Sequence, residues 1–393
     1  MVPQVGARAF DRTPSAVAAR IQWRCRSYTL LFAPRGRLLT TRDESEMKKA
    51  IGLFIVALLA QPSAHAQIAA KCKQILSLDV PITASGTYCM SRSLTGTGLV
   101  IDASDVRIDM RGYSIINSQV AQGGSYYTST SQVGIRSEND ANISVQNGNV
   151  IGFDYGVRIG HPYGARGTVM VANLLVRGSK QIGIDVLGYD EVTVVNNTVS
   201  DTVGPVTIGM QVAGMKRPAS EGGNNVSVVK VEGNRVDNTR SQGTTPVPWR
   251  GSTGMIVGEG GLTFVQSNTV TNTSTSDLSY QVTGLHVHGR HPNVINIINN
   301  TILNSSVLNN SAGLLATQGG TPSYTGDGPL GVGLVSGTKL YGYFYGVFGQ
   351  SDIWVNGVQT FVRTITFSNN VVSGADPTRA YLGGILGKAN RIE

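Results

Sequence analysis

The fold of this chain is decided by a stretch that reads Gly183-Ile184-Asp185-Val186 and then, a few residues later, Val192-Thr193-Val194-Val195-Asn196-Asn197. The first motif is a glycine followed by an apolar, any and an apolar residue. The second alternates apolar residues with others before an asparagine pair. Alternation with a period of two predicts a β-strand, so each motif is expected to form one strand with its apolar side chains on one face.

Both motifs recur in a fixed order along the chain. The glycine motif begins, in steps of 22 to 45 residues, at Gly134, Gly156, Gly183, Gly209, Gly254, Gly284, Gly313, Gly346 and Gly384. The second motif, with a gap near residue 338, begins at Ile143, Val169, Val192, Val229, Thr263, Ile295 and Ile365. A fixed order repeated at this period indicates a solenoid, in which one repeat is one coil.

A single coil of this kind has almost no core, because each motif supplies only two or three inward apolar side chains. Coils that stack as parallel strands about 4.8 Å apart align these side chains into a continuous core. Val194 and Ile297 are therefore expected to face the core, and Thr193 and Asn296 to face outward. Asparagine pairs such as Asn196-Asn197 are predicted at corners, where asparagine tolerates a left-handed backbone and its amide bonds along the stack.

The front of the chain has the pattern of a bacterial signal peptide. Met47 is followed by Lys48-Lys49, by an apolar run from Ala50 to Ala60, and by the cleavage motif Ala64-His65-Ala66 before Gln67. The apolar run is too short to span a bilayer comfortably. We therefore expect residues 47–66 to be removed, and the protein to be secreted or periplasmic without a stable membrane anchor.

Residues 1–46 precede this signal and carry eight Arg against four acidic residues. We interpret them as a disordered extension upstream of a true start at Met47; a cytosolic extension or a transit peptide is the alternative. Residues 67–393 then form a single domain with an N-terminal cap at 67–100. Residues 1–66 contribute +6 to the formal net charge of +8, so +2 remains on residues 67–393, and nothing indicates a nucleic acid partner.

Three cysteines are present, and Cys25 lies in the predicted leader. Cys72 and Cys89 remain in the exported chain, where two cysteines most simply pair as a disulfide. We expect this disulfide to fasten the cap that shields the apolar end of the first coil. No cluster of histidines accompanies the cysteines, so a metal or catalytic role is not predicted for them.

Four segments carry a resemblance to a known family: Thr95 to Ile101, Ser104 to Ile115, Asn142 to Gly148 and Gly152 to Val157. They resemble the opening coils of secreted proteins of the pectin-lyase-like superfamily, of the carbohydrate-binding and sugar-hydrolase repeat type. The resemblance covers about residues 72–393. It implies an all-β fold, a right-handed parallel β-helix of about nine to ten coils with three parallel sheets. It does not imply one activity, since the superfamily contains lyases, hydrolases, epimerases and binding proteins.

The motifs of the active branches are incomplete here. Polygalacturonase-like hydrolases are expected to carry an Asp-Asp pair and a Gly-His-Gly motif. Residues 67–393 contain neither of them. Arg290-His291-Pro292 matches the start of the Arg-x-Pro-x-x-Arg motif of pectate lyases, but the position of the second arginine is occupied by Ile295. The Asp-Pro-His-Asp of mannuronan epimerases is also missing. Each enzymatic interpretation therefore lacks a required group.

The residue between the two apolar positions of each glycine motif is expected to point outward, in one row across the coils. That row reads Arg136, Arg158, Asp185, Gln211, Ile256, His286, Leu315, Phe348 and Leu386. Its polar early part is the pattern expected for binding an elongated polar ligand; a merely solvated face is the alternative. Outward side chains are expected to add little to stability. Arg136 and Arg158 should repel each other unless an anion, or an acid such as Glu138, lies between them.

Longer segments interrupt the coil spacing and carry aromatic residues. Tyr126 and Trp249 are predicted to wall a groove above Arg136, Arg158 and Asp185, although an exposed tryptophan often only packs within its loop. His286 and His288 share the outward face, which permits a metal or general-base role beside that of an ordinary surface pair. Asp185 lies several coils from His286. We predict no obligatory metal and no cofactor.

Three functions fit these patterns. The first is binding of carbohydrate, an acidic polysaccharide or glycan surface, without demonstrated catalysis. The second is a polysaccharide lyase or C5-epimerase, in which Arg158 neutralises a uronate and His286 abstracts the neighbouring proton, with Asp185 as a further catalytic candidate. The third is a structural surface protein or adhesin. The missing enzyme motifs favour the first.

Overall fold

The computed structural model describes residues 72–121, 130–138, 141–214, 227–242, 251–258, 260–276, 281–290, 294–319, 332–355, 358–361, 365–375, 377–382, 385–386 and 388–393. The chain divides into two compact units, Met1–Gln67 and Ile68–Glu393, and every described element belongs to the second. The predicted extension and signal peptide lie outside the described residues. Within the described ranges, no helix has the length and apolarity needed to cross a membrane.

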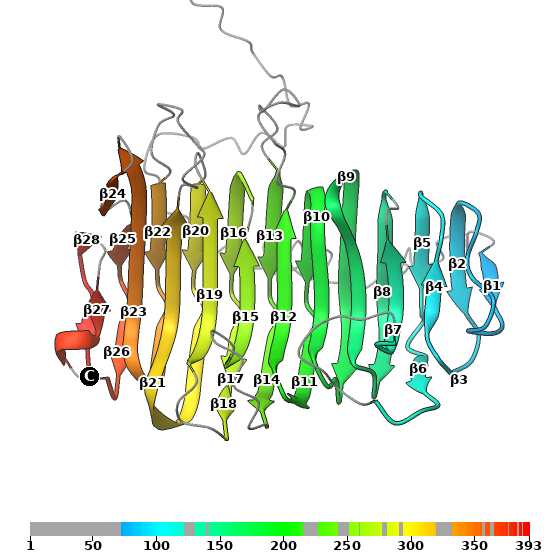
Figure 1. Ribbon diagram of the computed structural model, residues 1–393, viewed down its shortest axis with the longest axis horizontal. Coiled ribbons are helices and arrows are strands. Elements are labelled where there is room, and N and C mark those ends of the chain that lie inside the picture. The colour runs from blue at the N-terminus through cyan, green and yellow to red at the C-terminus, as the bar shows by residue number, and fades with distance from the viewer. Residues whose placement is uncertain are drawn as a thin grey trace, which may run out of the picture. The chain divides into compact units, whose positions relative to one another are not determined.

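Strands dominate the second unit and follow one another along it from β1 to β29 (Figure 1). Their parallel pairings form three series, which we call the first, second and third sheets. The first sheet contains the glycine motifs, and consists of β4 (Leu99–Ile101), β7 (Val133–Glu138), β9 (Tyr155–Arg177), β10 (Ile182–Val195), β12 (Thr207–Gly214), β15 (Ser252–Gly258), β19 (Val282–Arg290), β21 (Thr301–Gly319), β23 (Lys339–Val355) and β27 (Tyr381–Leu382).

The second sheet contains the motifs that end in asparagine pairs. Besides the middle of β9 and the end of β10, it consists of β1 (Lys73–Ile75), β2 (Gly86–Met90), β5 (Val106–Asp109), β8 (Ile143–Ile151), β13 (Val228–Glu232), β16 (Leu262–Gln266), β20 (Val294–Ile298), β22 (Val332–Ser336), β25 (Ile365–Ser368) and β28 (Ile385–Leu386).

The third sheet follows the asparagine corners. It joins the ends of β8 and β9 and the starts of β21 and β23 to β3 (Leu94–Gly96), β6 (Ser114–Asn117), β11 (Thr198–Gly204), β14 (Arg235–Ser241), β17 (Thr269–Thr271), β18 (Ser274–Thr275), β26 (Val371–Ser373) and β29 (Arg391–Ile392). A hairpin of β23 with β24 (Val358–Phe361) is antiparallel, and η2 (Pro377–Arg379) is a short 3-10 turn. The predicted all-β fold, a right-handed parallel β-helix, is confirmed.

The core is the continuous stack of inward side chains that the alternation predicts. Val194 and Ile297 are both fully buried. Their neighbours Thr193 and Asn296 are half-buried on the outer face. The predicted phase of the second-sheet strands is therefore confirmed.

The glycine that opens each first-sheet motif is required by close packing across the coil. A Cβ on Gly183 would overlap Val199 Cγ1 of the third sheet and lie 2.5 Å from the carbonyl oxygen of Gly209 in the next coil. The same packing repeats along the column, so each glycine lets a third-sheet side chain reach the inner face of the first sheet. The column runs from Gly134 to Gly346, and the residue that follows Gly346 in the next coil is Ala380.

This column corrects the last copy of the glycine motif. We expected the outward row to end at Leu386, in the motif beginning at Gly384. The register instead pairs Phe348 with Leu382. Leu386 pairs with Phe367 in the second sheet. The prediction was wrong because Ala380, and not a glycine, occupies the glycine position of the last first-sheet strand. Gly384 begins a stretch that matches the motif in sequence but lies outside the first sheet.

The two members of each asparagine pair have different roles at the corner. The first adopts the left-handed backbone conformation, as Asn196 does with φ of 55°. The second is buried and bonds to the neighbouring coils: the Asn197 backbone N–H donates to Asn234 Oδ1 at 2.9 Å, and Asn197 Nδ2 donates to the Val171 carbonyl at 3.0 Å. The expected structural role of these pairs is thereby confirmed.

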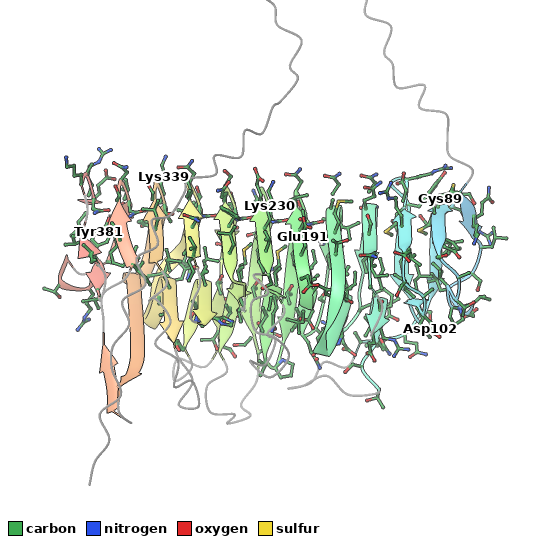
Figure 2. The ribbon with its side chains drawn as sticks, turned by 90° about the horizontal axis from the view of Figure 1, so that it is seen from above. Cys89, Asp102, Glu191, Lys230, Lys339 and Tyr381 are labelled. Carbon is green, nitrogen blue, oxygen red and sulfur yellow. A yellow bond between two sulfur atoms is a disulfide. The ribbon has the colours of Figure 1, made fainter. Side chains whose placement is uncertain are left out.

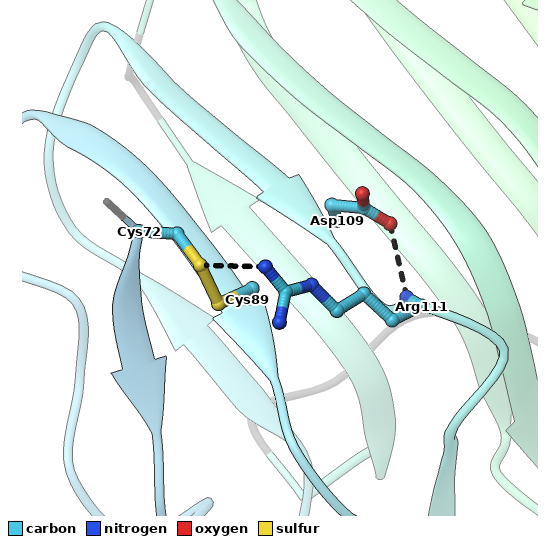
Figure 3. Close-up of a disulfide and its surroundings, with 4 residues drawn as sticks. All are labelled: Cys72, Cys89, Asp109 and Arg111. Atoms are coloured by element: carbon cyan, nitrogen blue, oxygen red, sulfur yellow. Dashed lines mark hydrogen bonds between the residues drawn. A yellow bond between two sulfur atoms is a disulfide. The ribbon is translucent and has the colours of Figure 1, made fainter. Parts of the chain in front are cut away.

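The N-terminal coils are fastened by a disulfide between Cys72 and Cys89, as predicted (Figure 3). Its Cα atoms are 5.7 Å apart, and it joins the segment before β1 to β2. Arg111 Nη2 donates a hydrogen bond to Cys72 Sγ at 3.2 Å, and the Arg111 backbone N–H donates to Asp109 Oδ1 at 2.9 Å. A disulfide at this place is consistent with an extracellular or periplasmic protein.

Candidate functional site

The outward row of the first sheet forms the candidate site, because its members are direct partners in successive strands. The pairings run in order through Val100, Arg136, Arg158, Asp185, Gln211, Ile256, His286, Leu315 and Phe348. Parallel strands lie about 4.8 Å apart, so the row is a straight track with one side chain per coil. The predicted order from Arg136 to Phe348 is confirmed.

Asp185 differs from the solvated residue that we expected at its position. Its side chain is 2% exposed, and that of its partner Arg158 is 21% exposed. Arg158 Nη1 donates a hydrogen bond to Asp185 Oδ2, and the Arg158 guanidinium lies over the ring of Tyr155, 5.2 Å from its centroid. The outward position thus holds a buried ion pair, because the arginine of the preceding strand lies against the carboxylate.

Burial governs the ionisation of Asp185. It raises the pKa of the carboxyl to about 6, while the positive charge of Arg158 acts in the opposite direction. Asp185 Oδ1 has no hydrogen-bond partner among the described residues. A buried carboxylate that accepts few hydrogen bonds is poorly stabilised in its charged form, which is why desolvation outweighs the neighbouring cation.

Among the described residues, Arg136 is the cation of the row that has no acidic partner. It lies between Val100 and Arg158 in the register, and neither neighbour offers a negative charge. Glu138 follows two residues later on the same strand. The acid that offsets the two arginines is Asp185, which leaves a net charge of about +1 on the three side chains.

His286 lies further along the track, paired with Ile256 and Leu315. Burial, and to a smaller extent the positive charge of the nearby His288, lowers the pKa of His286 to about 4. The imidazole is therefore neutral at pH 7 and a weak base, whereas an effective general base has a pKa near the working pH. Its ring centroid is 5.3 Å from that of His288.

Asp185 and His286 do not form a catalytic pair. Three strand steps separate them in the register, which corresponds to about 14 Å at the ordinary strand spacing. Tyr126 and Trp249, the predicted walls of the groove, lie outside the described residues. Among the described residues, no three histidine, cysteine or acidic side chains gather as a metal site.

A second feature escaped the sequence analysis. A shallow groove of about 530 Å³ crosses the outer face of the second sheet, and its lining includes Thr87, Arg107, Ser144, Met170 and Thr193. These side chains are the outward members of successive second-sheet strands, so the same alternation that located the first row also gives this one. Figure 2 shows the side chains along the stack, with Glu191 and Lys230 on neighbouring coils.

The comparisons with known proteins assign no family. No protein-family model matches the chain, and neither a curated protein nor a solved structure gives a significant match. The resemblance to the pectin-lyase-like superfamily is supported in its fold, by the stack of parallel strands, and remains a prediction in its membership.

Proposed function

We propose that this protein binds an acidic polysaccharide along the outward row of the first sheet, with Arg136 as the principal contact. The observation that carries the proposal is the position of Arg136. It is half-buried, it has no acidic partner among the described residues, and a second arginine occupies the next strand. A guanidinium in this position is stabilised by an anion that comes from outside the chain.

A uronate carboxylate suits this place. Arginine presents paired N–H donors that match the two oxygens of a carboxylate, and such charge-assisted bonds are among the strongest hydrogen bonds in proteins. Arg158 already bonds to Asp185, so its charge contributes to the local field rather than to a second full contact. We therefore assign the direct contact to Arg136 and a supporting role to Arg158.

An extended ligand fits better than a compact one. The row continues from Arg136 through Gln211 to Ile256 as a straight track, with one outward side chain on each coil. A rigid track of this kind matches a polymer that repeats its contacts along its length. The low net charge of residues 67–393 argues against nucleic acid, which is usually bound by an extended basic surface.

A lyase or C5-epimerase is the second candidate, and one observation favours it. Asp185 is a buried carboxyl with a pKa of about 6 beside a cation, and displaced pKa values of this kind are concentrated at catalytic sites. His286, which we predicted as the base, lies three strand steps from Asp185 and is too far away to act with it. Binding without catalysis remains the better supported function.

Binding of the purified protein to polygalacturonate and alginate, compared with the neutral polymer dextran, tests the proposal. Isothermal titration at low salt should detect the two uronate polymers and not dextran. Arg136→Ala should weaken uronate binding by more than about tenfold, which is 1.4 kcal/mol, and higher salt should weaken binding by the parent. Absorbance at 235 nm, recorded on the same samples, would reveal the unsaturated product of a lyase.

The matched control is Arg235→Ala, which removes an exposed arginine of the third sheet that lies 3.7 Å from Asp237. This variant should bind uronate polymers as the parent does. Equal binding by the parent and by Arg136→Ala would refute the assignment of Arg136. Failure of the parent to bind any uronate polymer would refute the proposed ligand.

A further inference from the structure

We propose that His286 and His288 form a binding site for one zinc ion, with these two ligands among the described residues and the remaining positions filled by water or a bound ligand. The site is independent of the proposed polysaccharide contact at Arg136, because five strand steps separate Arg136 from His286 in the register.

Strand geometry brings the two imidazoles together. His286 and His288 alternate with the buried Val287 in β19, so both side chains lie on the outer face of the first sheet. The neighbouring strand provides space for the second ring, because a Cβ on Gly258 would overlap the His288 imidazole. Gly258 is the direct partner of His288 in the register, so the ring lies where the preceding coil has no side chain.

The separation of the rings fits a shared tetrahedral ion. Zinc binds imidazole nitrogen at about 2.0 to 2.1 Å, which places each ring centroid about 3 Å from the metal. Two such rings at a tetrahedral angle have centroids about 5 Å apart. The observed centroid separation is 5.3 Å, and the rings are tilted by 48° rather than stacked in parallel.

The residue type indicates which metal the site would take. Imidazole ligands suit zinc, copper and nickel, and a nearly tetrahedral arrangement favours zinc. With two protein ligands, the site should bind more weakly than a structural zinc site that has four.

Zinc titration of the purified protein by calorimetry, in a buffer that does not bind metals, tests this site. The parent should bind one zinc ion, and zinc should raise its melting temperature. His286→Gln and His288→Gln should each weaken zinc binding by more than about tenfold, since even the loss of an indirect partner weakens metal sites by that factor. His161→Gln is the matched control and should bind zinc as the parent does.

A second measurement uses the parent protein alone, so its result does not depend on whether the variants fold. Diethyl pyrocarbonate modifies accessible imidazoles, and mass spectrometry locates the label. Zinc should protect both His286 and His288 from labelling. Parent-like zinc affinity in either single variant, or labelling of both histidines that zinc does not alter, would overturn the proposed site.

Discussion

Arg158 on β9 and Asp185 on β10 are direct partners in adjacent parallel strands, and the arginine donates a hydrogen bond to a carboxylate that is almost fully buried. This pair changes the meaning of the outward row, whose members we expected to contribute little to stability. At this position the row contributes to the packing of the stack as well as to any ligand site. Asp185 also places a negative charge beside Arg158, and this charge offsets the expected repulsion between Arg136 and Arg158.

Arg158→Ala should therefore destabilise the protein as well as affect ligand binding. Removal of the arginine leaves a buried acid without its cationic partner, and an unsatisfied buried group costs about 1 to 3 kcal/mol. Urea unfolding at pH 7 measures the change. Arg235→Ala should stay within about 0.5 kcal/mol of the parent, because its ion pair is exposed. A parent-like stability for Arg158→Ala would show that the pair does not contribute to folding.

The dependence of stability on pH should show two opposing contributions. The folded-state pKa of Asp185 is raised to about 6, so the folded state binds its proton more tightly and stability falls as the pH rises from about 4 to 6. The folded-state pKa of His286 is lowered to about 4, so its contribution rises with pH from about 4 to 6.5. In the parent these two slopes largely cancel.

Single variants should separate the two slopes. With Asp185→Asn, the free energy of unfolding should rise more steeply than in the parent between pH 4 and 6, by on the order of 3 kcal/mol across that window. With His286→Gln, it should fall over the same window. Guanidinium unfolding at several pH values measures both variants. Identical profiles for the parent and Asp185→Asn would contradict the raised pKa.

The corner at Thr338 lacks a ladder asparagine, although the coils on both sides of it have one. Thr338 occupies the position between Asn300 and Asn370, and its hydroxyl is buried without a hydrogen-bond partner among the described residues. Thr338→Asn should add bonds like those of Asn234, whose Nδ2 donates to Asn268 Oδ1 at 3.0 Å. The expected gain in unfolding free energy is about 1 kcal/mol.

Asn234→Ala is the converse control for this corner. It removes an amide that both donates and accepts within the ladder, so it should cost more than about 1 kcal/mol. Thermal unfolding of the two variants checks both signs. A lower melting temperature for Thr338→Asn would show that this corner has no room for the amide.

Two inward and two outward substitutions test which side chains of the second-sheet strands face the core. Val194→Asp and Ile297→Asp each place an unpaired charge in the core and should cost more than about 3 kcal/mol. Thr193→Ser and Asn296→Ser change half-buried outward positions and should stay within about 0.5 kcal/mol of the parent. Circular dichroism melting curves compare the two sets. Similar losses in both would contradict the phase.

Most of the fold was predictable because the physical rules of a parallel stack are local. Alternation defines which side chains of each strand face inward, and the fixed order of motifs defines which strands pair. The order of the row from Arg136 to Phe348 follows from these two rules. The copy at Ala380 was not predictable in this way, since its alanine departs from the glycine pattern and Gly384 imitates it nearby.

The candidate site depends on features that no single motif contains. The order of the motifs is enough to place Arg158 and Asp185 at the same point in neighbouring strands. The burial of Asp185, its hydrogen bond from Arg158 and the lack of such a partner for Arg136 among the described residues are visible only in the folded stack. The separation of 5.3 Å between the rings of His286 and His288 was likewise decided by side-chain packing over Gly258. Burial and pairing depend on what the adjacent coil places against a side chain, and residues distant in the sequence determine that environment.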